Sequence, residues 1–320
     1  MSTNQQSDNF DQYNVVLLAG GVGGAKLADG LAQILPAQRL NIVVNTGDDF
    51  QHLGLKICPD LDTVMYMLAG VNNDETGWGR QNESWRTISE AGRLGGPDWF
   101  KLGDLDLATH LVRSHMLEEG KPLTAATRQL CQRFGVSVSV LPMSDQPAPT
   151  TIESDDGIRP FQEWFVKERW QPAANKIHFP EDIKASPAVM SALQKADLVL
   201  IAPSNPFVSI DPILNVYPIK SMVTDLPMAV VAVSPIIGGR AVKGPAAKMM
   251  AEMGMPVTAA AVADYYGDLI DGFVYDQEDA GTLEGLDVAH LAVDSWMQDQ
   301  ADRVRLAKDV LAFASELANS

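Results

Sequence analysis

Short, continuous apolar segments alternate with helical patterns along most of this chain. Four of these segments end at glycine, proline or polar residues, and they lie at 14–19, 40–45, 197–202 and 228–233. Segments of this kind are typical of parallel strands that are buried on both faces. Between the first two, apolar residues recur at helical spacing over 25–35. A strand, a helix and a second strand in this order form a βαβ unit, which predicts a parallel sheet.

The remaining patterns predict an α/β fold, a mostly parallel sheet with helices on both faces. Further helices are predicted at 62–69, 106–118, 123–134, 161–170, 244–253 and 296–318. Late strands are predicted at 256–262 and 272–275, and a hairpin is predicted from 136–141 and 150–153. The region 72–184 lacks the continuous apolar segments, so we interpret it as an inserted lid. The chain is expected to form one domain over 13–320, after a flexible tail at 1–12.

Composition narrows the class of function. The net charge of −17 argues against a nucleic acid partner, because proteins that bind its phosphate backbone usually carry a basic surface. Two cysteines without a CxxC pair argue against a disulfide framework or a structural zinc site. The polar N-terminus does not resemble a signal peptide, and no apolar segment reaches membrane-spanning length. We therefore expect a cytoplasmic protein without a membrane partner.

A glycine-rich turn follows the first predicted strand and precedes the first predicted helix. Its glycines are Gly20, Gly21, Gly23 and Gly24, and Lys26 follows them. Glycines let the backbone approach a ligand closely, and a helix N-terminus offers free N–H groups to phosphate. The spacing matches neither the dinucleotide-binding GxGxxG motif nor a Walker A loop. The turn therefore predicts a phosphate site of another type, with a tight structural turn as the alternative.

Two acidic turns follow the second predicted strand. Asn45 and Thr46 lead into Asp48 and Asp49, and adjacent carboxylates on a turn suit a hard cation such as Mg²⁺. Asp62, followed by Thr63, stands where the next helix is predicted to begin. It can serve as that helix's N-cap, as a second metal ligand facing Asp48, or as both.

Three further segments carry polar residues at element ends. Asp104 and Asp106 precede the helix that holds His110, and they can cap that helix or bind a cation. His110 lies four residues after Asp106, on the same face of the helix. Ser204, Asn205 and Ser234 follow the third and fourth predicted strands, in proline-containing loops. At the carboxyl edge of the sheet these loops can hydrogen-bond a base or a phosphate.

Taken together, these motifs resemble one family. GGVGGAK, NTGDD, CPDLDT, KLGDLDLATHLVRS, LPMSD, FQEWFV, APSNP, SPIIGG and KGPAAKMM are similar to motifs of the 2-phospho-L-lactate transferases (CofD/FbiA) of coenzyme F-420 biosynthesis. The resemblance runs from about Val15 to Phe273. It implies a Rossmann-like fold with a lid, in a homodimer.

The resemblance also implies a reaction. Members join a three-carbon acid, carried on guanosine diphosphate, to the deazaflavin alcohol Fo, and GMP leaves. Asp48 and Asp62 are expected to hold Mg²⁺ and to act in catalysis, with Asp62 orienting or deprotonating the attacking hydroxyl. The glycine loop is expected to hold the diphosphate, Lys101 to contact Fo, and the tryptophans of the lid region to cover its ring. The expected substrate-binding residues are Gly20, Gly21, Gly23, Gly24, Lys26, Asn45, Thr46, Thr63, Lys101, Ser204, Asn205 and Ser234.

Two departures from the family pattern bear on the substrate. Leu105 stands where many relatives have an arginine, and Gly24 and Ala25 replace a threonine and a proline. The second departure places the chain with the bacterial branch, so the acid stays open between phospholactate, phosphoenolpyruvate and phosphoglycerate. The alternative function is that of a related group of regulatory proteins that bind nucleotide sugars. KLGDLDLATH and FQEWF favour the transferase.

Overall fold

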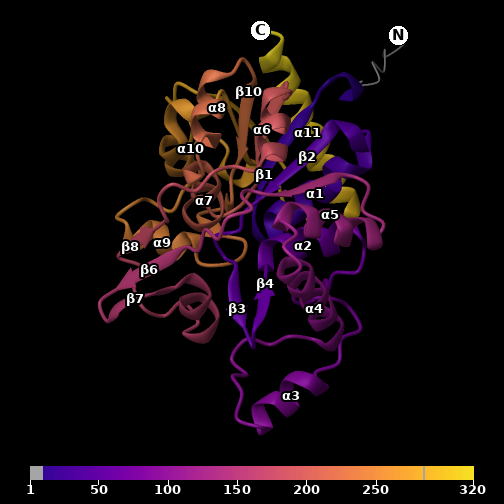
Figure 1. Cartoon of the computed structure of the whole chain (residues 1–320). Helices are drawn as coiled ribbons and strands as arrows, with labels where there is room; N and C mark the ends of the chain where they lie inside the picture. The colour runs from indigo at the N-terminus through magenta and orange to yellow at the C-terminus, as the bar shows by residue number, and fades with distance from the viewer. Residues whose placement is uncertain (1–9, 284) are drawn as a thin grey trace.

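A seven-stranded sheet forms the centre of the molecule (Figure 1), and every pair of neighbouring strands in it is parallel. This computed structural model describes residues 10–283 and 285–320. In spatial order the strands are β14 (Ala289–Val293), β13 (Gly272–Asp276), β10 (Ala229–Val233), β9 (Leu198–Ile201), β1 (Val15–Ala19), β2 (Leu40–Val44) and β5 (Ser139–Pro142). The predicted α/β class with a mostly parallel sheet is confirmed.

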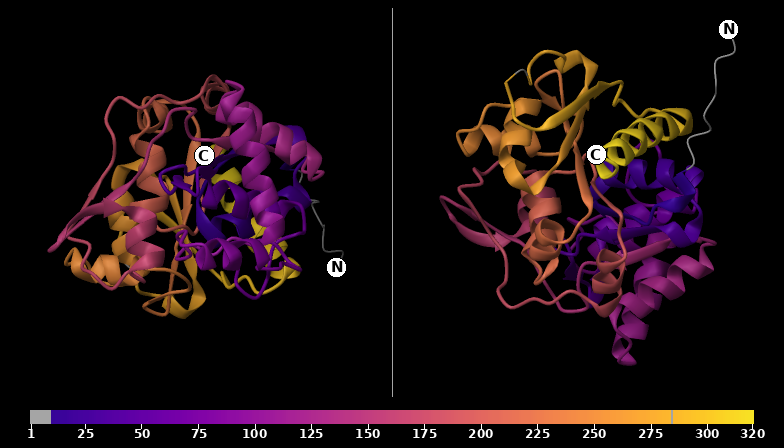
Figure 2. Two further views of the ribbon diagram at one scale, coloured as in Figure 1. Left: turned by 60° about the horizontal axis from the view of Figure 1, so that its bottom comes forward. Right: turned by 90° about the horizontal axis from the view of Figure 1, so that it is seen from above.

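Helices cover both faces of the sheet (Figures 1 and 2), because the central strands are apolar on both faces. One face carries α1 (Gly21–Ile34), α2 (Pro59–Leu68), α5 (Leu123–Arg133) and α11 (Gln300–Ala318). The other carries α6 (Pro187–Gln194), α7 (Asp211–Asn215), α8 (Ile219–Asp225), α9 (Ala246–Glu252) and α10 (Ala259–Tyr266). In β1, Leu17 packs into the first core and Leu18 into the second. Strand residues alternate between the faces, so one strand supplies both cores.

Smaller elements surround the sheet. The hairpin of β3 (Phe50–His52) and β4 (Leu55–Ile57) extends below it in Figure 1, with α4 (Asp104–Glu118) beside the hairpin and α3 (Arg86–Arg93) beyond it. A second sheet contains β7 (Gly157–Pro160), β6 (Thr151–Ser154) and β8 (Lys176–His178). β11 (Ile236–Ile237) pairs with β12 (Arg240–Ala241). The short helical turns are η1 (Phe10–Gln12), η2 (Ala37–Arg39), η3 (Glu163–Lys167), η4 (Pro206–Ile210), η5 (Gly267–Leu269) and η6 (Gln277–Asp279).

Two local predictions were wrong. The segments 136–141 and 150–153 do not form a hairpin, because β5 joins the main sheet beside β2 while β6 pairs with β7 and β8. Alternating residues predict a strand but not its partner. The segment 256–262 is not a strand, because most of it belongs to α10, whose N-cap Thr258 accepts a hydrogen bond from the amide of Ala261.

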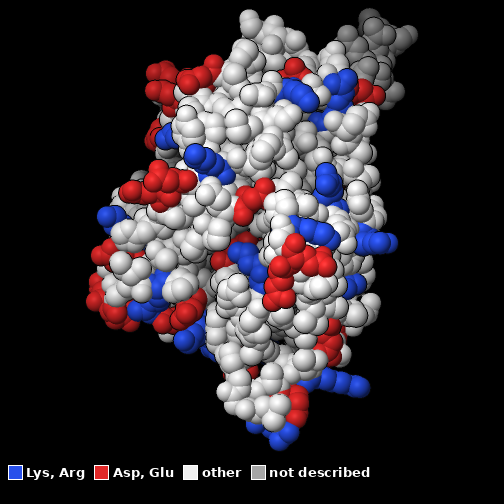
Figure 3. Space-filling model, in the orientation of Figure 1, with Lys and Arg blue, Asp and Glu red and all other residues white. Residues whose placement is uncertain are grey.

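The expected boundaries also change in detail. The predicted lid region, 72–184, contributes β5 to the main sheet. Most of the predicted tail, residues 1–9, lies outside the described residues, and Phe10 is buried in the first core. None of the helices in the described ranges has both the length and the apolar character needed to cross a membrane. Acidic and basic side chains are interspersed on the face shown in Figure 3.

Candidate active site

The glycine-rich turn is the start of a helix. β1 ends at Ala19, Gly20 is the N-cap, and α1 begins at Gly21, so the other loop glycines lie in its first turn. Gly21 has a φ of +63°, which favours glycine. A Cβ on Gly20 would lie 2.6 Å from Asp60 Oδ2, and one on Gly23 would lie 2.2 Å from the carbonyl oxygen of Pro203. These glycines therefore allow close packing, and the first turn of α1 stays partly accessible to an anion beside Asp60.

Ser204 ties this turn to the loop after β9. Its Oγ donates to the carbonyl of Gly20 at 2.7 Å and accepts from the amide of Gly20 at 3.2 Å. Ser204 is buried, and a Cβ on Gly24 would approach its Oγ to 2.9 Å. The two strand-end loops therefore meet at the predicted edge of the sheet, and Ser204 fixes the backbone of the glycine turn.

Asp48 lies beside Asp60, the aspartate that comes two residues before Asp62 in the chain. The fully buried amide Nδ2 of Asn45 donates to Asp48 Oδ1 at 2.8 Å and to Asp60 Oδ2 at 2.9 Å. Gln162 Nε2 donates to Asp48 Oδ2 at 3.3 Å, and the amide of Gly21 also donates to Asp60. Asp60 thus links the glycine turn to the acidic turn after β2.

Burial makes this pair of carboxylates costly to ionise. It raises the pKa of Asp48 well above its usual value, and the charge of Asp60 adds to the effect. It raises the pKa of Asp60 to about 6, against the hydrogen bonds from Asn45 and Gly21. Within the described ranges, neither carboxylate has an ion pair with lysine or arginine. Two buried carboxylates that share amide donors and lack a cationic partner are a suitable oxygen donor set for a divalent cation.

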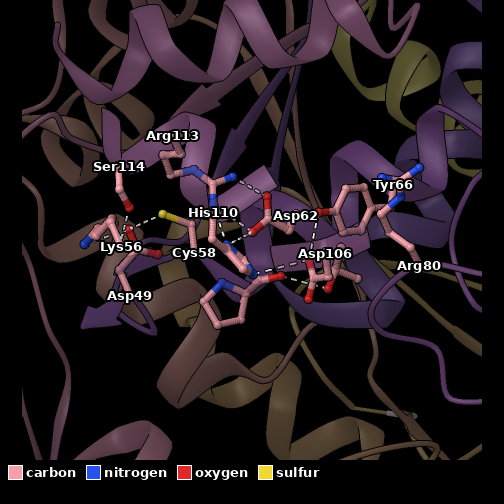
Figure 4. A network of polar contacts seen from close by, with 12 residues as sticks. Asp49, Lys56, Cys58, Asp62, Tyr66, Arg80, Asp106, His110, Arg113 and Ser114 are labelled. Carbon is pink, nitrogen blue, oxygen red and sulfur yellow. Dashed lines mark hydrogen bonds and ion pairs between the residues drawn. The ribbon is translucent and has the colours of Figure 1, made fainter. Parts of the chain in front are cut away.

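Asp62 lies in a different polar group, shown in Figure 4. Both of its carboxylate oxygens bond the guanidinium of Arg113, with Arg113 Nη1 at 2.9 Å from Oδ2 and Nη2 close to Oδ1. His110 Nδ1 lies 3.6 Å from the same Oδ2, and His110 Nε2 lies 3.3 Å from Asp106 Oδ1. Tyr66 donates to Asp106 Oδ1 at 2.8 Å. All five side chains are buried.

The N-cap prediction for Asp62 was wrong. Helix α2 begins at Pro59, with Cys58 as its N-cap residue, so Asp62 lies one turn inside the helix. Proline at the first helical position accounts for the earlier start. Asp60 and Asp62 are two residues apart, which places them about 200° apart around the helix. Only one of them can face Asp48, and in the structure it is Asp60.

Asp49 has its own partners. Its Oδ2 lies 3.1 Å from Lys56 Nζ and accepts from Cys58 Sγ at 3.1 Å. Burial raises the pKa of Asp49, and the Lys56 charge opposes that effect. The two adjacent carboxylates of this turn are therefore not equivalent, because Asp49 is neutralised by a lysine and Asp48 is not.

A cavity of about 420 Å³ lies between α4 and the loop that leads to α3. Its lining includes Trp78, Trp85, Lys101 and Asp106. Its volume is in the range of small-molecule sites, and its two indole rings offer flat apolar surface. The structure thus brings Lys101 and two of the lid tryptophans together.

The cavity adjoins the glycine turn through the loop 73–79. Thr76 lines the cavity, and a Cβ on the neighbouring Gly77 would lie 3.3 Å from a methyl group of Val22 in α1. Lys243 Nζ donates to the carbonyl of Thr76 at 2.5 Å, which holds this loop from the other side. The cavity therefore lies next to the N-terminal end of α1.

Most of the other predicted site residues form hydrogen bonds with backbone groups. Lys26 Nζ donates to the carbonyl of Met297, at 2.5 Å. Thr46 and Ser234 are buried, Thr63 Oγ1 donates to the carbonyl of Pro59, and Ser234 Oγ bonds the backbone of Ile236. Asn205 caps η4 through the amide of Phe207. Sequence reasoning missed Asp60 and Arg113. The motif CPDLDT contains both Asp60 and Asp62, but only the orientation of α2 shows which of the two carboxylates faces Asp48.

Comparison with known proteins gives the family. The model of the family described as 2-phospho-L-lactate transferase CofD matches residues 15–307. This chain belongs to that family. The chain is therefore a transferase, as the sequence motifs predicted.

The most similar relatives carry two names. A phosphoenolpyruvate transferase of Streptomyces griseus is 43% identical over 95% of this chain and 99% of its own length. A 2-phospho-L-lactate transferase of Methanosarcina mazei is 40% identical over 83% of this chain and 88% of its own. A crystal structure of a UPF0052 family member from Bacillus halodurans superposes with a TM-score of 0.64. It covers 93% of this chain and 99% of its own at 17% identity, so it supports the fold alone.

Proposed function

We propose that this CofD-family transferase moves a three-carbon acid phosphate from a guanosine diphosphate carrier to the hydroxyl of the deazaflavin Fo, with release of GMP. The observation that carries the proposal is the juxtaposition of three features. The open N-terminus of α1, the uncompensated pair of Asp48 and Asp60, and the tryptophan-lined cavity lie next to one another. A phosphoryl transfer needs a phosphate cradle, charge neutralisation and a positioned acceptor.

We propose phosphoenolpyruvyl as the transferred group. The similarity to the Streptomyces phosphoenolpyruvate transferase extends over 95% of this chain, whereas the similarity to the Methanosarcina 2-phospho-L-lactate transferase extends over 83%. Enolpyruvyl-diphosphoguanosine is then the donor, and the dehydro form of the F-420 precursor is the product. The lactyl donor is the alternative that the assay must separate.

Mg²⁺ fits the site through Asp48 and Asp60. Each carboxylate is buried, each keeps a raised pKa in the absence of a cation, and both face one amide donor. When bound there, the ion would supply charge neutralisation for the phosphates. The sequence predicted Asp62 in this role beside Asp48. We propose Asp60 in its place, because Arg113 already neutralises Asp62.

The protein's own groups then have distinct tasks. The first-turn amides of α1 that follow Gly21, whose own amide bonds Asp60, bind the diphosphate, and Ser204 holds their backbone in place. Trp78 and Trp85 bind the deazaflavin ring, with Lys101 at the same cavity. The acceptor oxygen attacks the phosphorus that carries the acid, and a new P–O bond forms. The bond to GMP breaks with its electron pair on the departing phosphate, and the hydroxyl proton is released to solvent.

A direct assay tests this proposal. Purified protein is incubated with Fo, Mg²⁺ and either the enolpyruvyl or the lactyl donor, and the products are identified by mass spectrometry. We expect the dehydro product to form faster from the enolpyruvyl donor, and GMP to appear in equal amount. No product from either donor would overturn the proposed function. Faster turnover of the lactyl donor would overturn the choice of acid alone.

Competition experiments test the nucleotide. GDP is expected to compete with the donor more strongly than ADP or UDP. Fo, which is fluorescent, is titrated separately. If UDP competes more strongly than GDP and Fo does not bind, the result would favour the alternative of a regulatory protein that binds nucleotide sugars.

A further inference from the structure

Asp106 is the member of the buried network that reaches the cavity. It lies in the first turn of α4, and it lines the cavity together with Lys101 and Trp85. Asp62, in contrast, has both carboxylate oxygens bonded to Arg113. The two aspartates are linked by His110, whose ring lies between them (Figure 4).

The proton position on His110 follows from its neighbours. Arg113 Nη1 lies 3.2 Å from His110 Nδ1, and a guanidinium can only donate. Nδ1 is therefore the acceptor, and the ring proton is on Nε2. Nε2 lies 3.3 Å from Asp106 Oδ1, so the protonated nitrogen is beside that oxygen, but it makes no hydrogen bond with it. Arg113 thus sets the tautomer that His110 presents to Asp106.

The two oxygens of Asp106 have different surroundings. Oδ1 accepts a hydrogen bond from the hydroxyl of Tyr66 at 2.8 Å and lies 3.3 Å from His110 Nε2. Among the described residues, no side chain or amide donates to Oδ2. The Tyr66 hydrogen bond and the neighbouring imidazole hold Oδ1 in place. They leave the second oxygen as a hydrogen-bond acceptor at the cavity wall.

We propose that Asp106 Oδ2 binds the reacting hydroxyl of the acceptor, and that Tyr66 and His110 are the residues that position it. This inference rests on the proposed function, which supplies an alcohol as the acceptor. A hydroxyl that donates to a fixed carboxylate has its oxygen lone pairs directed away from that carboxylate, and they are then free to meet the phosphorus. A hydrogen bond of this kind aligns the nucleophile, which is a large part of phosphoryl transfer catalysis.

The other carboxylates of the cavity are less suited to this task. Both oxygens of Glu83 accept backbone amides, from Leu105 at 2.8 Å and from Asp106 at 2.8 Å. Asp98 is exposed, and among the residues that the structure describes no buried donor fixes its side chain. Asp98 therefore provides a matched control, because it has the same charge and lines the same cavity.

The test compares Fo with an analogue whose terminal ribityl hydroxyl is replaced by hydrogen. Binding of both is measured by fluorescence titration with wild type, Asp106→Ala and Asp98→Ala. A hydrogen bond to a charged group predicts that wild type prefers Fo by roughly tenfold or more. Asp106→Ala should lose this preference, while Asp98→Ala should keep it. An unchanged preference in Asp106→Ala overturns the inference.

Two further measurements keep the outcomes apart. If wild type neither binds Fo nor turns over, the proposed function fails. If wild type forms product and Asp106→Ala keeps the preference, only the role of Asp106 fails. Should Asp106→Ala not fold, Tyr66→Phe replaces it, because it removes one donor to Oδ1 and keeps the charge. Its preference for Fo should fall at least threefold with little change in binding of the analogue, and an unchanged preference overturns the inference.

Discussion

Two pairs of buried aspartates lie on either side of the N-terminal end of α2, and they differ in how their charge is balanced. Asp48 and Asp60 share the amide of Asn45, and in the described ranges they have no cationic side chain as partner. Asp62 and Asp106 are joined by His110, and Arg113 neutralises the first of them. Burial is similar in the two pairs, but only the second has its own counter-charge.

The comparison shows which pair is suited to an external cation. A buried carboxylate without a partner raises its pKa and costs stability when ionised, as Asp48 and Asp60 do. Asp106 behaves in the opposite way. Burial would raise its pKa, but the adjacent His110 ring, the hydroxyl of Tyr66 and the charge of Arg113 bring the pKa below its usual value. We therefore propose the first pair for metal binding and the second for positioning.

The largest effect is expected when the balanced pair, Asp62 and Asp106, loses the cation that neutralises Asp62. Arg113→Met leaves the Asp62 carboxylate buried without its cation, and removal of one partner of a buried ion pair typically costs about 3–5 kcal/mol. Urea denaturation should show a loss of this size in the free energy of unfolding. The double variant Arg113→Met/Asp62→Leu is the control and should recover much of it. A loss below about 1 kcal/mol in the single variant would contradict the account of this pair.

Removing a charge from the unbalanced pair, Asp48 and Asp60, should instead raise the free energy of unfolding. Asp48→Asn removes one of two neighbouring buried charges, so at pH 8 without metal it should stabilise the protein by about 1–3 kcal/mol. Gln162 can turn its amide to accept from the new side chain, since it already lies 3.3 Å from this position. The same variant should abolish turnover. Chemical denaturation in chelator measures the first effect. Destabilisation there would show that the charge of Asp48 is already compensated.

Stabilisation by Mg²⁺ should depend on pH. The pKa of Asp60 is about 6 in the folded metal-free protein, above its ordinary value, so the ionised form is disfavoured in the folded state. In the absence of metal, the contribution of Asp60 to the free energy of unfolding therefore falls as pH rises from about 4 to 6. Below pH 6, Mg²⁺ must compete with a proton for this carboxylate. We expect saturating Mg²⁺ to raise the melting temperature by roughly 2–4 °C at pH 8, and by less at pH 5.5.

A matched variant makes the Mg²⁺ measurement specific. Asp60→Asn should lose the shift at pH 8, whereas Asp104→Asn should keep it, because Asp104 bonds Ser84 and the amides of Arg86 and Thr87 near α3. Asp104 and Asp106 were the alternative location of the metal. Loss of the shift in Asp104→Asn and its retention in Asp60→Asn would move the metal to that turn.

The smallest effect is expected at Tyr66, the neutral side chain that donates to Asp106 of the balanced pair. Tyr66→Phe removes the 2.8 Å hydrogen bond to Asp106 but keeps the ring packed against Phe134. Loss of one buried hydrogen bond costs about 1 kcal/mol, well below the loss expected for Arg113→Met. Thermal unfolding and urea denaturation should agree on this order. Equal losses in the two variants would show that packing, and not charge, dominates this network.

The sequence by itself determined the class of fold and the edge of the sheet at which the site lies. Continuous apolar strands can only be buried on both faces, and parallel strands bring the turns that follow them to one edge. The glycine turn, the acidic turn after β2 and the Ser204 loop were therefore placed correctly at one edge. The family motifs predicted the transferase, and the family comparison confirms it.

Tertiary structure alone decided which aspartate faces which partner. Asp60 and Asp62 are two residues apart in one motif, and the orientation of α2 against β2 turns the first toward Asp48 and the second toward Arg113. Arg113 comes from α4, 51 residues further along the chain than Asp62. Pattern and spacing report which residues share a helix face, whereas charge balance depends on contacts between helices that are distant in sequence. The same physical reason explains the wrong hairpin, since β5 found its partner in β2 across the core.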